Sequence, residues 1–255
     1  GRKIRDCYVA RPGYKLLSID LSQIELRMLA HVSRDPSLCL AYLNGEDIHT
    51  ATAADVLGKP QSMVTDTERR DAKEANFGID YGMSAQGLLN SMQRNGVDLE
   101  AEKKDVEWAE GFIGGLFMRR PGIKRYMNRV RRFVERHLFV KDPYGRRRWV
   151  FEALAHFQRG VFEAGMRKAI NMPIQGGAGW VMWHGLIALD EILASRPDLD
   201  ASMWLQIYDS VELEVREDQV EEVARLGEGA LTTAIRLHVP LAAESKWGDR
   251  WGSLT

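Results

Sequence analysis

The stretch Leu16–Leu29, which reads Leu-Leu-Ser-Ile-Asp-Leu-Ser-Gln-Ile-Glu-Leu-Arg-Met-Leu, decides how this chain folds. Residues 16–19 form a short apolar run of the length and type expected for a buried strand. Residues 24–29 mix apolar and polar side chains and predict that the backbone turns into a helix. Asp20 stands where the strand should end. A carboxylate in that place costs free energy unless a cation or hydrogen-bond donors compensate it.

Two explanations fit Asp20. It could cap the following helix together with Ser22, because Ser22 and Glu25 have the spacing of a capping box. It could instead bind a metal ion. These residues alone do not decide between the two.

The composition is typical of a soluble globular protein, with 45% hydrophobic and 28% charged residues among 255. That length allows one large domain or two smaller ones. The longest apolar stretch, residues 176–189, contains His184 and is shorter than the roughly 20 residues that span a bilayer. Cys7 and Cys39 stand apart in the sequence, which fits a reducing compartment and no cysteine-bound metal. We expect a cytoplasmic protein without a membrane partner.

The net charge of −1 hides a strongly basic segment at residues 119–148. Arg and Lys dominate it, and only Glu135 and Asp142 oppose them. An Arg-rich stripe on an otherwise acidic protein is typical of a surface that binds a polyanion such as nucleic acid. The other reading is a solvated helix face.

Cations and aromatic rings follow one another every four residues at Arg69, Lys73, Phe77 and Tyr81. At about 3.6 residues per turn, this spacing places the four along one slowly winding helix face. Cations would suit phosphates and rings would suit a sugar and base, so the face predicts a nucleoside triphosphate site. A mixed surface face remains the alternative. His49 follows a candidate helix cap and suits a neutral imidazole or one that faces an anion.

Residues 203–215 alternate with period 2, which predicts a strand or a hairpin. Ile207, Val211, Leu213 and Val215 share one parity, and Asp209 falls on it with them. A carboxylate on the apolar side of a strand or at a hairpin tip needs a partner, as Asp20 does. Two strand-linked carboxylates are what a divalent-cation site requires.

The rest of the chain predicts a short strand and turn in residues 1–15 and a mainly helical remainder. Further helices are expected at residues 51–57, 100–118, 122–137, 157–171, 179–194 and 217–237. Pro173 is expected to interrupt the helical pattern that contains Arg167 and Asn171. A last short strand is expected at residues 239–244.

The motifs resemble those of family A DNA polymerases, the group of bacterial DNA polymerase I and many phage replicases. Residues 20–27 resemble motif A, residues 69–82 resemble motif B, and residues 206–210 resemble motif C. Shorter matches lie at residues 47–49, 145–148 and 171–176. The resemblance covers nearly the whole chain.

This resemblance implies an α+β fold, with an antiparallel palm sheet and a helical fingers insertion. The palm would comprise residues 1–32 and 141–255, and the fingers residues 33–140. Nothing in this chain corresponds to the thumb or the exonuclease domain of the family. We therefore expect a fragment or a split form that works with an N-terminal region or with a separate chain carrying those domains.

The resemblance also implies the roles of individual residues in DNA synthesis. Asp20, Asp209 and the Leu21 carbonyl would hold two Mg²⁺ ions, for which Mn²⁺ could substitute, and Lys73 would be catalytic as a proton donor to pyrophosphate. The dNTP would be bound by Gln23, Glu25, His49, Arg69, Lys73, Phe77 and Tyr81. The primer–template DNA would be bound by Arg146, Arg167, Asn171, Gln175 and Tyr208. Glu25 and Tyr81 would crowd the 2′ position of the sugar.

Motif C departs from the family pattern. The usual His-Asp-Glu is replaced by Tyr208-Asp209-Ser210, which removes one acid near the metals. A non-catalytic primer–template binding module, or a polymerase subunit that depends on a partner, is therefore an alternative. An RNA polymerase or reverse transcriptase is another, although Glu25 argues against RNA synthesis.

Overall fold

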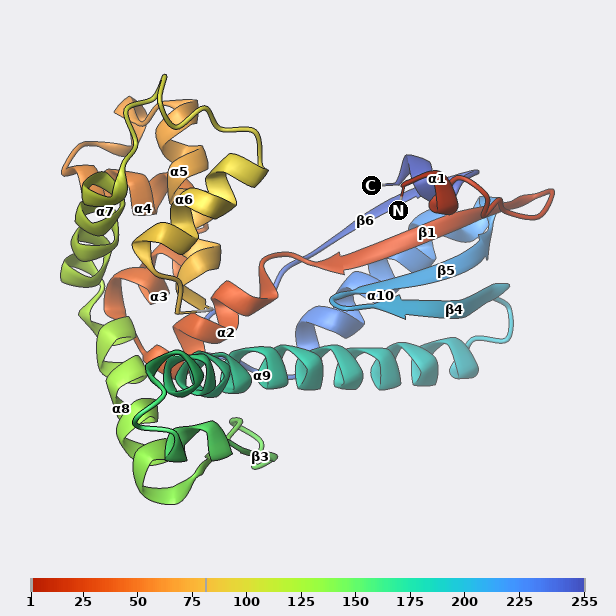
Figure 1. Ribbon diagram of the computed structural model, residues 1–255. Helices are drawn as coiled ribbons and strands as arrows, with labels where there is room; N and C mark the ends of the chain where they lie inside the picture. Colours follow the sequence, from red (N-terminus) through yellow and green to blue (C-terminus); the bar gives the residue numbers. More distant parts are fainter. Residues whose placement is uncertain (1, 81, 255) are drawn as a thin grey trace. The chain divides into compact units, whose positions relative to one another are not determined.

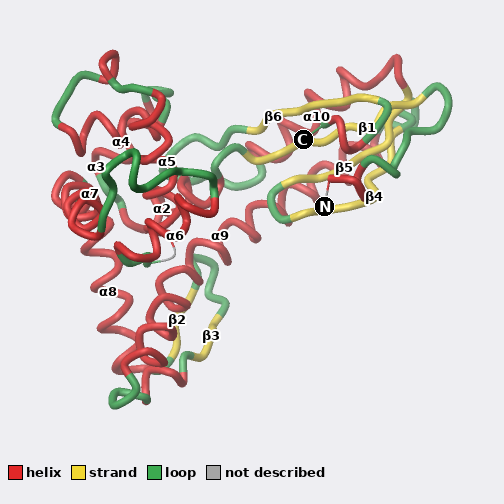
Figure 2. The backbone as a smooth tube through the Cα atoms, turned by 45° about the horizontal axis from the view of Figure 1, so that its top comes forward, coloured by secondary structure: helices red, strands yellow, loops and turns green. Residues whose placement is uncertain are grey.

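The computed structural model describes residues 2–80 and 82–254. The chain folds into two compact units. Residues 1–24 and 178–255 form unit 1, and residues 25–177 form unit 2. Unit 1 contains the four-stranded sheet, and unit 2 is almost entirely helical, with a short two-stranded hairpin (Figure 2). The chain is therefore α+β, as the sequence predicted.

Unit 1 is built on an antiparallel sheet with the strand order β4-β5-β1-β6 (Figure 1). The strands are β1 (Tyr14–Leu21), β4 (Ala201–Ile207), β5 (Ser210–Arg216) and β6 (Ala243–Gly248). The apolar run at residues 16–19 lies in β1, which pairs on both edges and is a central strand. The start of motif A is therefore held by hydrogen bonds on both sides.

One face of the sheet is covered by α10 (Val220–Thr233), which follows the short helix η3 (Glu217–Gln219). Leu17 and Ile19 of β1 are fully buried. A Cβ atom at Gly227 of α10 would lie 2.2 Å from Cδ1 of Ile19, so a larger residue there would force the Ile19 side chain or the helix to shift. This face forms the core of unit 1.

The opposite face carries α1 (Arg2–Arg5) and η4 (Trp251–Ser253), which contact each other. Leu16, Trp251 and Leu254 form a small buried cluster there. The separate strand expected in residues 1–15 is wrong, because Arg2–Arg5 are helical, Val9 makes an isolated bridge to Arg250, and the first strand begins at Tyr14. A four-residue helix has too little apolar periodicity to be found from sequence.

In the described residues of unit 2 there are seven α-helices besides part of α9, two short 3-10 helices and one pair of hairpin strands. The elements are α2 (Ile24–Ser33), α3 (Pro36–Leu43), α4 (Ile48–Leu57), η1 (Gln61–Met63), α5 (Asp66–Asp80), α6 (Ala85–Arg94), α7 (Val106–Arg119), α8 (Pro121–His137), β2 (Phe139–Lys141), β3 (Arg147–Trp149) and η2 (Phe151–Leu154). Side chains cap several of these helices. Asp35 caps α3 through Leu38 N–H and also accepts Gly122 N–H at 2.7 Å, which ties α8 to α3.

Several element boundaries differ from the sequence expectation. The helix expected from residue 100 begins at Val106, because Asp105 caps it through Trp108 N–H. The helix expected to residue 237 ends at Thr233, and the last strand lies at residues 243–248. Residues 139–149 form a hairpin with a basic tip, as the turn residues predicted.

The expected break at Pro173 is wrong. Residues Arg159–Ser195 form one helix of 37 residues, α9, with Pro173 inside it. Pro173 lacks an N–H and costs about 3 kcal/mol in a helix interior. Its neighbours Met172 and Ile174 are buried, so packing of this segment outweighs that cost. Among the described residues no helix, α9 included, is long and apolar enough to cross a membrane.

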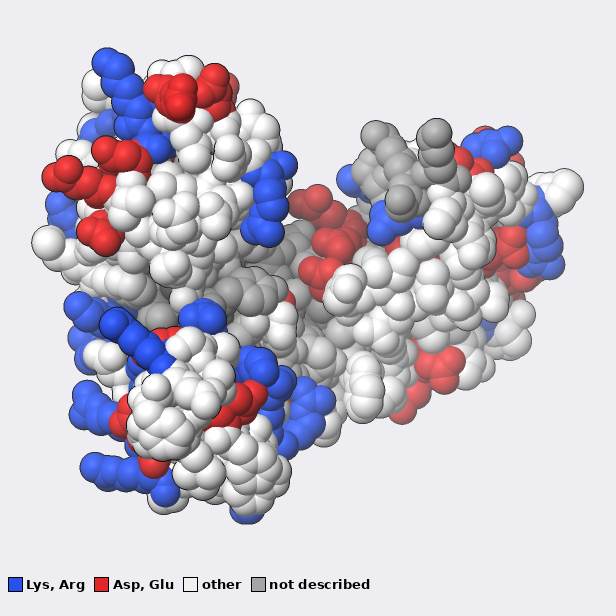
Figure 3. Space-filling model, in the orientation of Figure 1, with Lys and Arg blue, Asp and Glu red and all other residues white. Residues whose placement is uncertain are grey.

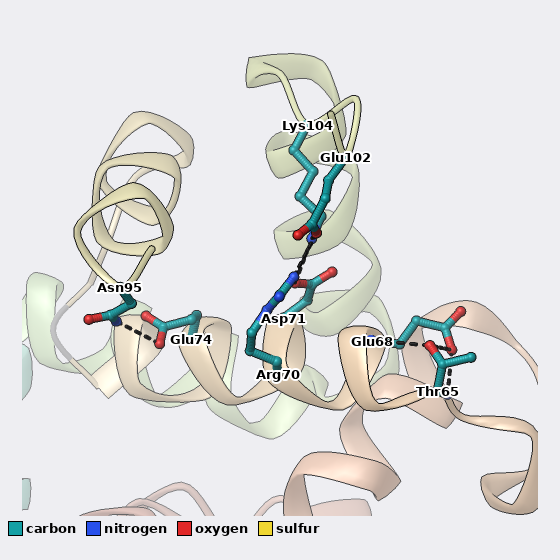
Figure 4. A network of polar contacts seen from close by, with 8 residues as sticks. All are labelled: Thr65, Glu68, Arg70, Asp71, Glu74, Asn95, Glu102 and Lys104. Carbon is teal, nitrogen blue, oxygen red and sulfur yellow. Dashed lines mark hydrogen bonds and ion pairs between the residues drawn. The ribbon is translucent and has the colours of Figure 1, made fainter. Parts of the chain in front are cut away.

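A polar network holds one side of α5 in unit 2 (Figure 4). Lys104 Nζ lies 2.6 Å from Asp71 Oδ1, with both side chains about 5% exposed. Glu102 accepts from Lys104 and from Arg70. Farther along α5, Glu74 accepts from Ser91 and Asn95 of the α6 region. These contacts fix the α5 helix, on which motif B lies.

We predict that Asp71→Ala lowers the free energy of unfolding by about 3 kcal/mol, because Lys104 would be left charged and buried without its deepest partner. Urea unfolding followed by circular dichroism measures this. Lys168→Ala is the matched control, since it breaks the more exposed Lys168–Glu152 pair and should change stability by less than about 1 kcal/mol. Equal effects of the two substitutions would contradict the anchoring role of Asp71.

Candidate active site

The carboxylates of motifs A and C lie on neighbouring strands of unit 1. In the pairing of β1 with its two neighbours, Asp20 lies opposite Ser210 of β5 and Glu244 of β6. Ser18, two residues earlier, lies opposite Glu212 and Lys246 in the same way. Residues two apart in a strand share a face. Acidic and basic side chains thus gather on one face of the sheet, around Asp20.

A two-residue turn, Tyr208-Asp209, joins β4 to β5. Leu21 N–H donates to the Asp209 carbonyl at 2.9 Å, so the end of β1 is bound to the hairpin tip. Tyr208 has a φ of 51° and is 90% exposed. A bulky residue in this left-handed region is uncommon and strained. The structure therefore brings Asp20 and Asp209 together, at a cavity of about 370 Å³ that both line.

The single alternation expected through residues 203–215 is wrong at the hairpin. The chain reverses at residues 208–209, so Ile207 pairs with Ser210 and packs on the cluster of Leu16 and Trp251. Val211 and Leu213 belong to the other face, in the core. Asp209 lies at the hairpin tip, one of the two positions that the sequence allowed.

The field around Asp20 is strongly negative. Partial burial and, after it, the charges of Asp209, Glu244 and Glu212 together raise the pKa of Asp20 to about 6, against a smaller opposing effect of Lys246. Burial also raises the pKa of Asp209. Asp20 lies inside β1, four residues before α2 begins, so it is not the N-cap of that helix. Its negative charge calls for a cation.

The donor set around Asp20 fits a hard divalent cation. Carboxylate, carbonyl and water oxygens are the ligands that Mg²⁺ prefers. The Leu21 side chain is fully buried, so only its backbone could serve as a ligand. Within residues 2–80 and 82–254, no three or more His, Cys, Asp and Glu side chains already form a metal cluster. Mg²⁺ usually keeps several waters and takes one or two carboxylates from a protein, and Asp20 and Asp209 line one cavity.

The exposed face of α5 carries the predicted cations and one ring in unit 2. Arg69, Lys73 and Phe77 are exposed, while Ala72 and Ala75 between them are buried. Tyr81 lies outside the described residues. In the described part of the chain, no hydrogen bond or ion pair occupies the Lys73 ammonium group. Lys73, one helical turn from Arg69 and without an acidic partner among the described residues, is suited to bind an anionic ligand.

Arg69 already has a partner, which the sequence did not reveal. Its guanidinium group contacts both carboxylate oxygens of Asp47, at 3.1 and 2.7 Å. Asp47 also caps α4 through Thr50 N–H at 2.7 Å. Burial would raise the pKa of Asp47, but the hydrogen bonds from Arg69 and Thr50 outweigh it and hold the pKa well below its usual range. Asp47 therefore stays ionised and orients Arg69.

His49 is held neutral beside this pair. Its side chain is buried, and that burial lowers its pKa to about 4. Asn76 places its amide nitrogen 3.1 Å from Nδ1. In this orientation of the Asn76 amide, its nitrogen can only donate, so Nδ1 of His49 accepts. The proton of the neutral ring is then on Nε2. Phe77 lies next to the ring, with centroids 5.9 Å apart.

Gln23 and Glu25 begin the helical part of motif A. Gln23 has a φ of 55°, directly before α2. Glu25 accepts a hydrogen bond from Gln175 Nε2 at 3.3 Å, so motif A and the 171–176 segment are in contact within unit 2. Glu25 is therefore positioned from a distant part of the chain.

Three of the predicted DNA-binding residues share a cavity of about 220 Å³ in unit 2. Arg146, Asn171 and Gln175 line it together with Arg148 and Lys168. Asn171 is buried, and its Oδ1 makes no hydrogen bond among the described residues. Lys and Arg also gather over α8 and the β2–β3 hairpin, shown in blue in Figure 3. This is the basic surface predicted at residues 119–148.

The two remaining predicted DNA contacts lie elsewhere. Arg167 is exposed, and a Cβ atom at Gly82 would lie 3.2 Å from its Cγ, so it runs close to the end of motif B. Tyr208 belongs to unit 1, at the tip of the β4–β5 hairpin.

The sequence matches the family model of DNA polymerase family A across residues 1–253. This chain belongs to DNA polymerase family A. The resemblance of motifs A, B and C is thereby confirmed.

Named relatives of this family A chain are bacterial DNA polymerases I. It is 42% identical over 252 residues to DNA polymerase I of Pseudomonas aeruginosa and 39% identical over 251 residues to the thermostable DNA polymerase I of Thermus filiformis. Each alignment covers 98% of this chain, but 26% and 28% of the relative. This family A chain thus spans about a quarter of the length of these curated relatives.

A solved structure agrees with the family A assignment. The POL domain of Pol1 from M. smegmatis, in complex with DNA primer-template and dNTP, matches with a TM-score of 0.86 and 33% identity. The match covers 99% of this chain and 43% of that one. The fold of a family A polymerase region is therefore shared.

Sequence reasoning missed three charged residues around Asp20 of this family A chain. Glu212, Glu244 and Lys246 all line the same cavity as Asp20 and Asp209. Their alternation within strands gives only the signal of an ordinary polar face. The register that places them beside Asp20 depends on long-range pairing, which no local pattern encodes.

We predict that Asp20→Asn raises the thermal midpoint of this family A chain by a few degrees in EDTA at pH 8, because it removes a charge that its neighbours repel. A carboxyl with a raised folded-state pKa lowers stability progressively as pH rises from about 4 to about 6. The gain should therefore be smaller at pH 5 than at pH 8. Differential scanning calorimetry measures both.

Asp190→Asn is the control for this measurement, since Asp190 is an exposed acid on α9. It should leave the midpoint unchanged at both pH values. A midpoint of Asp20→Asn at or below wild type in EDTA at pH 8 would contradict the repulsion among the carboxylates.

Proposed function

We propose that this chain catalyses template-directed DNA synthesis, joining a dNTP to the 3′-OH of a primer. One observation carries the proposal: Asp20 and Asp209, brought together by β1 and the β4–β5 hairpin, share a negatively charged cavity in a chain of family A. DNA primer–template and dNTP are the proposed partners, as in the M. smegmatis Pol1 complex.

The proposed cofactors are two Mg²⁺ ions, with Mn²⁺ as a substitute. Asp20, Asp209 and the Leu21 carbonyl would hold them. Bound Mg²⁺ would favour the primer 3′-oxygen as nucleophile and neutralise charge on the triphosphate. The Asp20 carboxylate would then be ionised at neutral pH, since the cation offsets the repulsion that raises its pKa.

The residues on α5 would bind and orient the triphosphate. Arg69 and Lys73 would contact phosphate oxygens, and Lys73 would give a proton to the departing pyrophosphate. His49, held neutral by burial, would donate its Nε2 proton rather than add a positive charge. Phe77 would lie against the sugar.

The sugar and the DNA would be recognised by residues positioned from several segments. Gln23 would bind the nucleotide, and Glu25 and Tyr81 would crowd the 2′ position of its sugar, with Glu25 as the gate against ribonucleotides. The proposed primer–template contacts are Arg146, Arg167, Asn171, Gln175 and Tyr208. The unsatisfied Oδ1 of buried Asn171 supports a polar ligand there, because such a group costs free energy without a partner.

The division into palm (1–32 and 141–255) and fingers (33–140) stays a prediction. We propose also that a thumb and an exonuclease domain act with this chain, from an N-terminal region or a separate chain. Relatives about four times its length support this. We propose cytoplasmic action, where DNA and dNTP are found together.

We predict that Asp209→Ala reduces primer extension by about 100-fold or more, because it removes transition-state charge stabilisation worth several kcal/mol. Extension of a labelled primer–template with dNTP and Mg²⁺ measures this. Asp218→Ala is the control, since Asp218 is exposed and paired with Arg216 at the other end of β5. Equal extension by wild type and Asp209→Ala would rule out the catalytic proposal.

The same assay separates the binding-module alternative, which the altered motif C raises. A chain that binds primer–template but extends nothing, with or without a thumb-bearing chain supplied, would favour a non-catalytic module. Extension that appears only when that chain is supplied would identify a partner-dependent subunit.

We predict that Glu25→Ala increases the ratio of ribonucleotide to deoxynucleotide incorporation by roughly tenfold, by opening space and removing a charge near the 2′ position. Competing rNTP and dNTP in single-nucleotide extension measures the ratio. Gln175→Ala is an informative companion, because it removes the amide that contacts Glu25. It should shift the ratio in the same direction, but less. An unchanged ratio for Glu25→Ala would refute the gate.

A further inference from the structure

We propose that Glu212 is a further positioning residue of the Asp20–Asp209 cation site, holding a water ligand of the bound cation. The inference rests on the proposed function. It concerns a residue that lies outside motifs A, B and C, on the strand that follows motif C.

The register places Glu212 one step behind Asp20 on the same sheet face. Glu212 is opposite Ser18, and Asp20 is opposite Ser210. At about 3.3 Å per residue, the Cα atoms of Ser210 and Glu212 lie roughly 7 Å apart along β5. Glu212 therefore lies behind Asp20 along the sheet, in the same cavity, where its carboxylate can accept from a water that the cation holds.

The burial of Glu212 is unusual for an acid. The residue is 3% exposed, and it lines the same cavity as Asp20 and Asp209. Oε1 accepts from Ser18 at 3.0 Å and from Ser210 at 3.1 Å. Oε2 is buried and, among the described residues, has no hydrogen-bond partner of regular geometry. Such an atom is costly unless a ligand completes it.

The neighbours of Glu212 satisfy its carboxylate only in part. Burial raises the pKa of Glu212, and hydrogen bonds from Ser18, Ser210 and Trp251 oppose that effect; the Trp251 contact falls short of a regular hydrogen bond to Oε2. Arg5 also favours the ionised form. Neither Arg5 nor Lys246, both at the cavity, forms an ion pair with it in the described chain.

Ser210 links Glu212 to motif C. The residue after Asp209 is a serine, where the family pattern has an acid. Its hydroxyl lies 3.1 Å from Glu212 Oε1 and 3.1 Å from the Ile207 carbonyl, and these two acceptors share its single proton. Residue 210 thus carries no carboxylate, but Glu212, two residues farther along β5 and on the same face, does.

The test measures Mn²⁺ binding to the full chain by electron paramagnetic resonance, without DNA or dNTP. Glu212→Gln should weaken Mn²⁺ binding by about tenfold, as loss of partners beyond the direct ligands does. Glu214→Gln is the matched control, because Glu214 is on the same strand and pairs with Arg11 outside this cavity. It should bind Mn²⁺ like wild type.

A second set of variants separates loss of the cation site from loss of the fold. Glu212→Leu should weaken Mn²⁺ binding while keeping the thermal midpoint in EDTA, since a leucine suits the neighbouring apolar cluster of Leu16 and Trp251. Adding Ser210→Glu to Glu212→Leu should restore most of the Mn²⁺ affinity. Unchanged affinity in Glu212→Gln, or no recovery in the double variant, would overturn the proposal.

These outcomes are separate from those of the proposed function. If wild type extends primers but Glu212→Gln binds Mn²⁺ normally, only the role of Glu212 is refuted. If wild type extends nothing, while Mn²⁺ binding depends on Glu212 as expected, the cation site stands and the polymerase activity of this chain fails.

Discussion

The pairing of β1 with β5 is the constraint on which the candidate catalytic centre depends. It joins residues nearly 200 positions apart in sequence, and the bond from Leu21 N–H to the Asp209 carbonyl closes it at the hairpin tip. Without that register, Asp20 and Asp209 would each be a single carboxylate at the end of a strand. With it, their charges repel each other, and the fold holds them together at a cost in free energy.

In unit 2, α5 exposes cations on one side while contacts on its other side hold the helix in place. Asp71 and Glu74 fasten one side of α5 to its surroundings through Lys104, Ser91 and Asn95. The opposite side is then free to present Arg69, Lys73 and Phe77 to solvent. Rigid support on one side, with Arg69 oriented by Asp47 and Lys73 without an acidic partner among the described residues on the other, is expected of a site that binds by preorganisation.

Local periodicity predicted the elements that carry chemistry, and long-range packing decided what it missed. The apolar run at residues 16–19 and the four-residue spacing on α5 follow directly from backbone geometry. The helix break expected at Pro173 does not occur, because burial of Met172 and Ile174 outweighs the cost of a proline inside the helix. Ile207 was expected on the same sheet face as Val211. The two turn residues reverse the chain, so Ile207 lies on the opposite face. Glu212 could not be found, because Ser18 and Trp251, which contact it, lie far from it in the sequence.

The contact between Arg69 and Asp47 has a consequence for ligand entry. Asp47 takes two of the five N–H donors of the guanidinium group, through Nε and one Nη. The other N–H groups can contact an anion without displacing Asp47. Thr50 N–H also donates to Asp47, so the carboxylate is held from a second side and fixes the plane of the guanidinium group. Arg69 would therefore offer an anion an edge that is already oriented, and less side-chain freedom would be lost on binding.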